Sequence, residues 1–292
     1  MSLAGSPPTT EGPGPDVGSA RSWLFVPGDR SDRFAKAAAS GADMVVLDLE
    51  DAVAEGAKAA ARESVACWVG AGRAACVRIN AHGTPSYDAD VAALTGLPGL
   101  AAVLVPKAED PQALVALSEA LGPDTPLVAL VESAVGVQRT DEVAAVPGVE
   151  RLAFGSIDLA LDLGAEDGCL PLLYARSRLV VASRAAGVAA PVDGVTPSLD
   201  DAGAVEADAV AAARLGFGGK LCVHPAQVAV VNTAFSPSEQ DVQHAQRVLA
   251  AAAGGGAVRL DGQLVDRPVL ERARRVLGRA GLPVPEASGS AP

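Results

Sequence analysis

The sequence predicts a (β/α)8 barrel, of the TIM-barrel type, followed by a C-terminal helical appendage. Three observations support this prediction. Eight short apolar runs with strand character alternate with longer, alanine-rich segments of helical period. These runs are apolar almost throughout, as parallel strands are when helices cover them. Eight strand–helix units within about 210 residues fit a closed barrel.

The predicted strands are short and are separated by segments of helical length. They are Trp23–Pro27, Met44–Leu49, Cys76–Asn80, Ala102–Pro106, Leu127–Glu132, Arg151–Gly155, Ala190–Asp193 and Lys220–His224. The segments between them, such as Pro111–Leu121 and Asp200–Leu215, have the Ala and Leu content of helices. A doubly wound sheet is the alternative fold, but no G-x-G-x-x-G motif follows the first strand to support nucleotide binding.

The regions outside the barrel differ from it in composition. Pro, Gly, Ser and Thr dominate the first 20 residues and predict a disordered tail. Beyond the barrel, two helical stretches, Pro237–Ala252 and Pro268–Ala280, are joined by a Gly-rich loop. Such an appendage is expected to cover a site or to dock on a neighbouring subunit. The predicted division is a tail (1–20), the barrel (21–235), a helical extension (236–282) and a second disordered tail (283–292).

Composition and charge exclude several classes of protein. The chain of 292 residues is 49% hydrophobic, which is ample for one large core. Its net charge of −12 argues against a nucleic-acid partner, which requires a basic face. Because no apolar run is long enough for a membrane span and no secretory signal is visible, we expect a cytoplasmic protein without a membrane partner. The four scattered cysteines form no C-x-x-C pair and are expected to be reduced, buried thiols.

Charged or polar side chains follow nearly every predicted strand. The active site of a (β/α)8 enzyme lies at the carboxyl ends of the strands, because the βα loops open there. The residues at these ends, in chain order, are Asp48, Glu50, Arg78, Asn80, Lys107, Glu132, Asp158, Asp193 and His224. The sequence therefore predicts a polar site at one end of an apolar barrel.

Within this set, Arg78 and Glu132 stand between β-branched or apolar neighbours. A charge buried in that way is expensive unless it is paired or bound to a metal, so solvent-exposed loops do not explain these two residues. Carboxylates without a His or Cys cluster favour a hard, oxygen-preferring cation. We therefore expect Glu132 and Asp158, from adjacent strands, to hold Mg²⁺.

Lys107 and the histidines allow other chemistry. A lysine at a strand end can form a Schiff base with a carbonyl substrate, but the many carboxylates nearby favour an ion pair for Lys107. His82 and His244 are expected at the surface, since the three histidines lack metal-ligand spacing. His224 either faces the site or braces the barrel.

A series of motifs, in this order and spacing, resembles the citrate lyase β-subunit family within the HpcH/HpaI aldolase superfamily. The resemblance covers about residues 22–280. Its motifs are Leu24–Arg30 with Arg33 and Phe34, Leu47–Val53 with Lys58 and Arg62, Val77–Asn80, Val105–Lys107, Leu130–Ser133, Phe154–Asp158, Asp193–Val195, Gly219–Lys220 with His224–Pro225, Phe235–Pro237, and Asp261–Gly262 with Val265–Pro268.

The resemblance implies a Mg²⁺-dependent enzyme that acts on a β-hydroxyacyl thioester, usually of coenzyme A. It implies that Glu132 and Asp158 are metal ligands, and that Arg78 binds the substrate carboxylate and carbonyl oxygen. Asp266 resembles an acid/base group that relatives donate into the active site of a neighbouring subunit. Further positions implied by the resemblance are Arg30 and Arg33 for coenzyme A phosphates, and Asp48, Glu50 and Lys107 in support of the reacting groups. Ile157 departs from the family, in which an acidic residue often precedes the metal-binding Asp.

We therefore predict a Mg²⁺-dependent carbon–carbon lyase for a small β-hydroxyacyl-CoA thioester such as malyl-CoA or citramalyl-CoA. The resemblance also implies a homo-oligomer, a trimer or hexamer, whose active sites are shared between subunits. One alternative is the β subunit of a citrate lyase complex that acts on a citryl thioester of an acyl carrier. Another is a barrel without catalytic activity that serves in binding or assembly.

Overall fold

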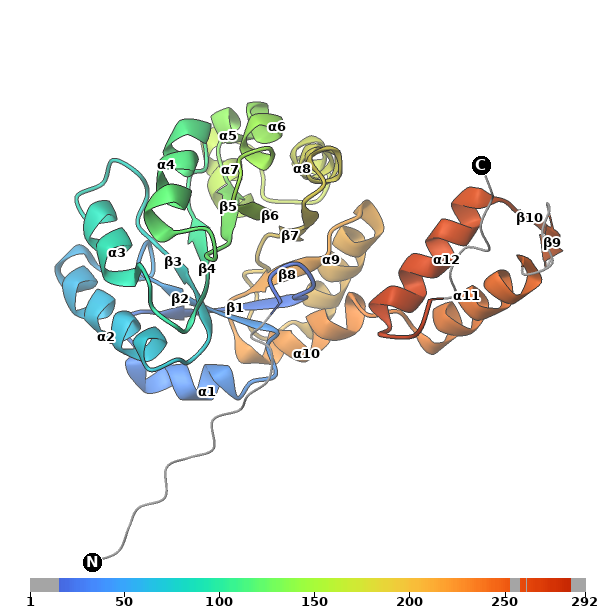
Figure 1. The fold of residues 1–292 in the computed structure, drawn as a ribbon, viewed down its shortest axis with the longest axis horizontal. Helices are drawn as coiled ribbons and strands as arrows, with labels where there is room; N and C mark the ends of the chain where they lie inside the picture. Colours follow the sequence, from blue (N-terminus) through green and yellow to red (C-terminus); the bar gives the residue numbers. More distant parts are fainter. Residues whose placement is uncertain (1–15, 253–257, 261, 285–292) are drawn as a thin grey trace, which may run out of the picture. The chain divides into compact units, whose positions relative to one another are not determined.

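Eight parallel strands form a closed barrel at the centre of the first structural unit (Figure 1). The computed structural model describes residues 16–252, 258–260 and 262–284. The barrel strands are β1 (Ser22–Pro27), β2 (Met44–Asp48), β3 (Ala75–Arg78), β4 (Leu100–Val105), β5 (Leu127–Val131), β6 (Val149–Phe154), β7 (Ala189–Asp193) and β8 (Gly219–Cys222). The predicted (β/α)8 barrel is thus confirmed, with each strand found within a few residues of its predicted bounds.

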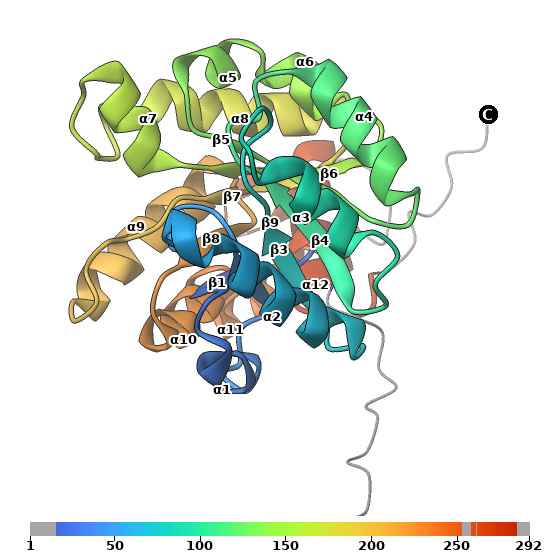
Figure 2. The same ribbon diagram turned by 90° about the vertical axis from the view of Figure 1, so that its left-hand side faces the viewer.

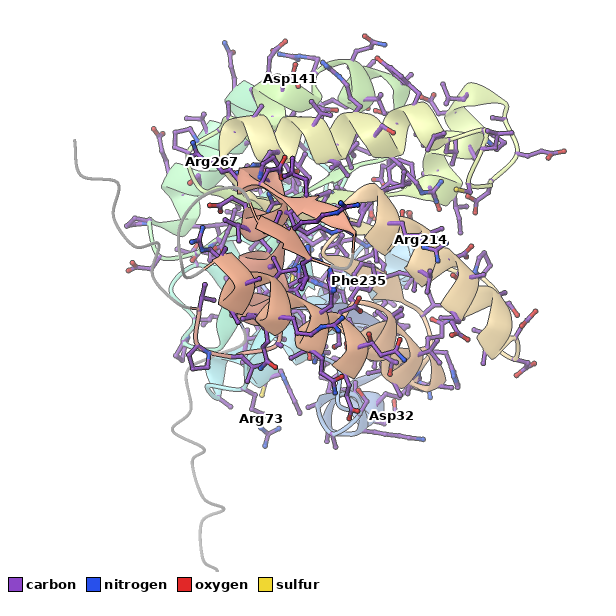
Figure 3. All side chains as sticks on the ribbon, turned by 90° about the vertical axis from the view of Figure 1, so that its right-hand side faces the viewer. Asp32, Arg73, Asp141, Arg214, Phe235 and Arg267 are labelled. Atoms are coloured by element: carbon purple, nitrogen blue, oxygen red, sulfur yellow. The ribbon has the colours of Figure 1, made fainter. Side chains whose placement is uncertain are left out.

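Helices surround the strands on all sides of the barrel (Figures 1 and 2). They are α1 (Phe34–Ala38), α2 (Lys58–Gly70), α3 (Tyr87–Leu94), α4 (Pro111–Leu121), α5 (Ala134–Gln138), α6 (Thr140–Ala144), α7 (Ser156–Leu163), α8 (Leu173–Ala186), α9 (Ala202–Leu215) and α10 (Pro225–Ala234), with 3₁₀ turns η1 (Ser31–Arg33) and η2 (Glu55–Ala57). Their exposed faces carry charged side chains, among them Asp141 of α6 and Arg214 of α9 (Figure 3).

Alternate residues of the strands point into the barrel and fill it in layers. Trp23, Met44, Cys76, Val128 and Leu221 belong to this buried interior. Further along the same direction, the inward positions carry charged residues, namely Asp48 of β2, Arg78 of β3 and Glu132 directly after β5. The apolar layers therefore support a charged layer at the carboxyl ends of the strands.

The opposite end of the barrel is closed by the segment before β1. Val17 and Ala20 are buried and pack against the interior residues. The fully buried Arg151 of β6 donates from Nη1 to the carbonyl oxygens of Val17 and Ala20, at 2.8 and 2.7 Å. The packed part of the chain therefore begins before residue 21, earlier than predicted for the N-terminal tail. Residues 1–15 of that tail lie outside the described residues.

A second compact unit begins at Thr233, and its described residues are 233–252, 258–260 and 262–284. It contains α11 (Glu239–Ala252), β9 (Val258–Leu260), β10 (Gln263–Val265) and α12 (Arg267–Arg279). Side chains of these elements form their own buried cluster, which includes Ala245, Val248 and Leu277. Both predicted helices are present, but the segment between them was wrongly predicted to be only a loop. It includes the antiparallel pair β9–β10, in which Leu264 is paired with Arg259.

Two predictions from composition have different outcomes. Within the described ranges, no helix is long and apolar enough to cross a membrane. All four cysteines are free thiols, but only Cys76 and Cys222 are buried. Cys67 and Cys169 are exposed, so the prediction of buried thiols was wrong for these two, because each lies on the solvent side of its segment.

Candidate active site

A cavity of about 320 Å³ opens among the residues that follow the barrel strands. Its polar lining consists of Asp48, Asp51, Arg78, Glu132, Ser156 and Asp158. Its apolar lining includes Phe25, Leu130, Phe154, Ile157, Val195 and Leu221. The predicted polar site at the carboxyl ends of the strands therefore corresponds to a cavity large enough for a small ligand.

Strand register brings the first two site residues together. Asp48 of β2 lies opposite Arg78 of β3, and both side chains line the cavity. Arg78 Nε donates to Asp48 Oδ1 at 2.7 Å, and Arg78 Nη2 donates to Asp48 Oδ2 at 2.6 Å. This two-point pairing fixes the plane of the guanidinium, which a lysine ammonium could not provide.

Two further groups hold the same guanidinium. Glu50 Oε2 lies 3.0 Å from Arg78 Nη1, and the guanidinium carbon lies 4.9 Å from the centre of the Phe25 ring. Burial lowers the pKa of Arg78, but the hydrogen bonds and charges of its carboxylate neighbours outweigh burial and raise the pKa above its usual value. Arg78 therefore presents a permanent, fixed positive charge to the cavity.

Glu132 follows β5 directly and is 4% exposed. Its Oε1 accepts a hydrogen bond of 2.9 Å from the backbone N–H of Lys107. Burial, together with the charges of Glu50 and Asp158, raises the pKa of Glu132 to about 8, although the Lys107 N–H and Arg78 act in the opposite direction. Burial likewise raises the pKa of Glu50 to about 7 against the effect of Arg78.

Burial is the larger cause of these raised pKa values, and the neighbouring carboxylates add to it. A bound cation would offset the negative charge of the ionised carboxylates. Asp158 is the third residue of α7, is half-buried and lines the cavity beside Glu132. Among the described residues, no group of three or more Asp, Glu, His or Cys side chains could hold a metal ion. Two carboxylates with room for water and substrate oxygens fit Mg²⁺ better than a metal that needs a closed protein cage.

Three further predicted residues, Arg30, Arg33 and Lys107, do not line this cavity. Arg30 and Arg33 lie in the turn after β1, outside the cavity lining, and Arg30 pairs with Asp32 at 3.1 Å. The Lys107 side chain is exposed and lines a different cavity, of about 210 Å³.

The prediction that the Lys107 ammonium forms an ion pair with a carboxylate was wrong. No carboxylate of the described residues lies within 4 Å of its ammonium, and Lys107 instead contacts Glu132 through its backbone N–H. This residue has a left-handed backbone, with a φ of 47°. The Schiff-base alternative gains no support, because the side chain lies outside the cavity that holds the carboxylates.

Asp266 lies in the second unit, where it caps α12. It is exposed, and its Oδ1 accepts a hydrogen bond of 3.2 Å from the backbone N–H of Val269. Pro268 in the first turn of α12 is also typical of a helix start. Asp266 therefore has a structural role in its own unit, and its acid/base role stays a prediction.

Two polar residues that line the cavity, Asp51 and Ser156, were not among the predicted site residues. Asp51 belongs to the same acidic run as Asp48, which was the available signal. Ser156 is buried, and its hydroxyl has no hydrogen-bond partner among the residues described. His224 neither faces the cavity nor braces the barrel; it is exposed, and its Nδ1 accepts a hydrogen bond of 3.3 Å from the Ala226 N–H.

A (β/α)8 barrel with carboxylates and one fixed arginine at the carboxyl ends of its strands has the architecture of a barrel enzyme with a candidate site for a hard cation. The chain belongs to the HpcH/HpaI aldolase/citrate lyase family, whose model matches residues 21–225.

Curated relatives cover nearly the whole chain. A citrate lyase subunit beta-like protein of Deinococcus radiodurans is 43% identical over 277 residues, which is 88% of this chain and 96% of the relative. An L-malyl-CoA/beta-methylmalyl-CoA lyase of Cereibacter sphaeroides is 35% identical, over 92% of this chain and 96% of that protein.

Among solved structures, the chain is similar to the protein CitE from Mycobacterium tuberculosis in complex with magnesium, acetoacetate and coenzyme A. The TM-score is 0.79 at 37% identity, and the match covers 90% of this chain and 98% of that structure.

Proposed function

We propose that this protein is a Mg²⁺-dependent carbon–carbon lyase that cleaves a small β-hydroxyacyl-CoA thioester, such as malyl-CoA or citramalyl-CoA, in a reversible aldol- or Claisen-type reaction. The observation that supports this most directly is the convergence of Glu132 and Asp158 on one cavity beside the fixed guanidinium of Arg78. The family of the chain supports the same reaction. So do the L-malyl-CoA/beta-methylmalyl-CoA lyase relative and the similar structure in complex with magnesium, acetoacetate and coenzyme A.

Glu132 and Asp158 would hold the metal, which when bound supplies a Lewis acid for the hydroxyl and carboxylate oxygens of the substrate. Arg78 binds the oxygen on which negative charge develops while the carbon–carbon bond breaks, because its charge and orientation are fixed before the substrate arrives. Asp48 and Glu50 keep that guanidinium in place through their hydrogen bond and ion pair.

Asp266 is proposed as the acid/base group. In cleavage the substrate hydroxyl would lose its proton to water as the carbon–carbon bond breaks, and Asp266 in its acid form would protonate the carbon of the departing thioester enolate. In condensation the Asp266 carboxylate would remove a proton from the acyl methyl group. The family resemblance suggests that one subunit provides this residue to the barrel of another, so we propose a homo-oligomer, a trimer or hexamer, with shared sites. A cytoplasmic location remains part of the proposal.

The apolar lining of the cavity bears on the substrate. Ile157 is 45% exposed, lines the cavity and lies next to Asp158, at the position where the family resemblance implies an acidic residue. An apolar side chain here favours an acyl substrate with a methyl or similar group near the reacting carbon. Arg30 and Arg33 are proposed to contact the coenzyme A phosphates, since both lie in the turn after β1.

The test is a panel of malyl-, methylmalyl-, citramalyl- and hydroxymethylglutaryl-CoA, assayed with Mg²⁺ and with EDTA. We expect cleavage of at least one thioester with Mg²⁺, loss of cleavage with EDTA, and release of acyl-CoA rather than free CoA. Glu132→Gln should be inactive, whereas Glu63→Gln, an exposed glutamate on α2, should match the wild type.

No cleavage across the panel would refute the proposal. Activity only with a citryl thioester of an acyl carrier would indicate a citrate lyase β subunit instead, and release of free CoA would indicate a thioesterase.

A further inference from the structure

Lys58, the first residue of α2, lies behind the turn that bears the acidic residues of the site. Its Nζ donates to the carbonyl oxygens of Leu49 and Glu50, at 3.1 and 3.0 Å, and to Asn80 Oδ1 at 2.6 Å. An ammonium has three N–H donors, so these three acceptors use all of them. Lys58 does not line the cavity of about 320 Å³.

The Asn80 amide is oriented by a chain of buried groups. Its Nδ2 donates to Leu49 O at 3.0 Å and to Asp90 Oδ2 at 2.6 Å, which leaves Oδ1 to face Lys58. Asp90 is fully buried, and its Oδ1 accepts a hydrogen bond of 2.7 Å from Arg62 Nε. The acceptor that Lys58 needs is therefore fixed by residues of two other segments.

The turn held by Lys58 is linked by hydrogen bonds to the groups that contact Arg78. Asp48 Oδ1 accepts from the backbone N–H of Glu50 at 2.9 Å, and the same carboxylate makes the two-point contact with Arg78. Glu50 adds its ion pair to the third guanidinium nitrogen. A shift of the Leu49–Glu50 backbone would therefore move both carboxylates that orient Arg78.

The positive charge of Lys58 also acts on the carboxylates of the neighbouring turn. Among the described residues, no carboxylate lies within 4 Å of its ammonium, so Lys58 faces only carbonyl and amide oxygens. Its positive charge therefore remains to offset the concentrated negative charge of Asp48, Glu50 and Asp51.

We infer that Lys58 is a positioning residue for the reaction. Anchored by Asn80, it fixes the Leu49–Glu50 turn so that Asp48 and Glu50 hold the Arg78 guanidinium toward the reacting oxygen. This role rests on the proposed lyase function, but the orientation of Arg78 can be measured without turnover.

The experiment compares Lys58→Met with Lys36→Met, an exposed lysine on α1, in the full-length protein. The first readout is the NMR signal of the Arg78 Nε–H group, assigned by its loss in Arg78→Lys. We expect it to shift or broaden in Lys58→Met and to be unchanged in Lys36→Met. The second readout is turnover of the thioester identified by the panel. We expect kcat to fall about 10- to 100-fold with little change in KM, because Arg78 acts on charge that develops in the transition state.

Two further measurements separate positioning from loss of structure. Mg²⁺ affinity should stay within about twofold of the wild type, because the proposed metal ligands do not contact Lys58. In an Arg78→Lys background, Lys58→Met should reduce kcat little further, since both changes remove the same function. Lys58→Arg should recover part of the activity, and Lys58→Gln provides a milder variant if Lys58→Met does not fold.

An unchanged Arg78 signal together with an unchanged kcat in Lys58→Met would overturn the inference. It would also be overturned if the fold-losses in kcat of Lys58→Met and Arg78→Lys simply multiplied in the variant that carries both substitutions. Failure of the whole thioester panel, together with the expected change in the Arg78 signal, would refute the lyase proposal and leave the positioning of Arg78 supported.

Discussion

Gly155 leaves the space that the Glu132 carboxylate occupies. Gly155 follows β6 and lies beside Glu132, which follows the neighbouring strand β5. A Cβ atom built on Gly155 would lie 2.6 Å from Glu132 Oε2 and would also overlap the Cβ atom of Glu132. Gly155 therefore leaves Glu132, the proposed metal ligand, free to take this orientation, because any larger residue at 155 must displace the Glu132 side chain.

Gly155→Ala is accordingly expected to weaken Mg²⁺ binding by about 10-fold or more, since the displaced Glu132 leaves its ligand position. Calorimetric titration with Mg²⁺ measures this directly. Gly56→Ala is the control, because a Cβ at Gly56 meets nothing within 4 Å. Equal Mg²⁺ affinity in Gly155→Ala and Gly56→Ala would contradict the role of Gly155.

The stability of the metal-free protein should depend on pH in a defined direction. The pKa of Glu132 is about 8 in the folded protein, above its ordinary value of 4.5. Between these values the folded state binds more protons than the unfolded state, so the free energy of unfolding should fall as pH rises from 6 to 8.5. Urea unfolding in EDTA at several pH values measures this fall. Glu132→Gln should reduce the slope but leave the part that is due to Glu50, whose pKa is raised to about 7, whereas Glu63→Gln should leave the slope unchanged.

Mg²⁺ affinity should show the opposite dependence. The metal binds the ionised carboxylate and competes with the proton, so affinity should rise with pH up to about the pKa of Glu132 near 8. Titration in buffers of different ionisation enthalpy should reveal proton release at pH 7. An affinity independent of pH between 6 and 8.5 would show that Glu132 is not a ligand.

Two substitutions separate the roles of Asp266. Asp266→Asn keeps a side-chain oxygen that can cap α12 but cannot transfer a proton at neutral pH. We expect this variant to keep the wild-type melting temperature and to lose at least about 100-fold in kcat. Asp266→Ala should lose both activity and about 1 kcal/mol of stability.

Site sharing gives a further expectation for the same residue. If subunits exchange, mixing Asp266→Asn with Glu132→Gln protein should restore part of the activity. Wild-type turnover in Asp266→Asn would exclude the acid/base role, and absence of recovery in exchanging mixtures would count against shared sites.

Ile157 should affect the choice of substrate more than the rate on every substrate. Ile157→Ala is expected to lower the preference for a methyl-substituted thioester over malyl-CoA by about 10-fold, because one buried methyl contact is worth about that much. The measurement is the ratio of kcat/KM values for the two thioesters. Leu161→Ala, on the same helix and 81% exposed, is the control. An unchanged ratio in Ile157→Ala would remove this residue from substrate selection.

Much of the barrel could be predicted because its strands are short, apolar and separated by helical segments. The order of the predicted strands then places Glu132 and Asp158 at the same end of neighbouring strands. This placement could be predicted from the sequence alone. The contact of Lys107 could not be predicted, because it depends on a backbone N–H in a left-handed conformation rather than on the ammonium.

Other features depend on packing between distant segments. In the sequence, Arg151 is an isolated charge at the start of a predicted strand. Its contacts with the carbonyl groups of Val17 and Ala20 form only when the chain folds, so they could not be predicted. The pair β9–β10 was missed because its strands have three residues each, too few for a periodic pattern.

In the proposed function, Glu132 and Asp158 hold the Mg²⁺ that the reaction requires. Calorimetric Mg²⁺ titration of the wild type, Glu132→Gln, Asp158→Asn and the Glu63→Gln control at pH 8 tests it most directly. We expect one Mg²⁺ per chain in the wild type and in Glu63→Gln, and a loss of at least about 10-fold in affinity in each of the other two variants. Unchanged Mg²⁺ affinity in Glu132→Gln and Asp158→Asn would contradict it.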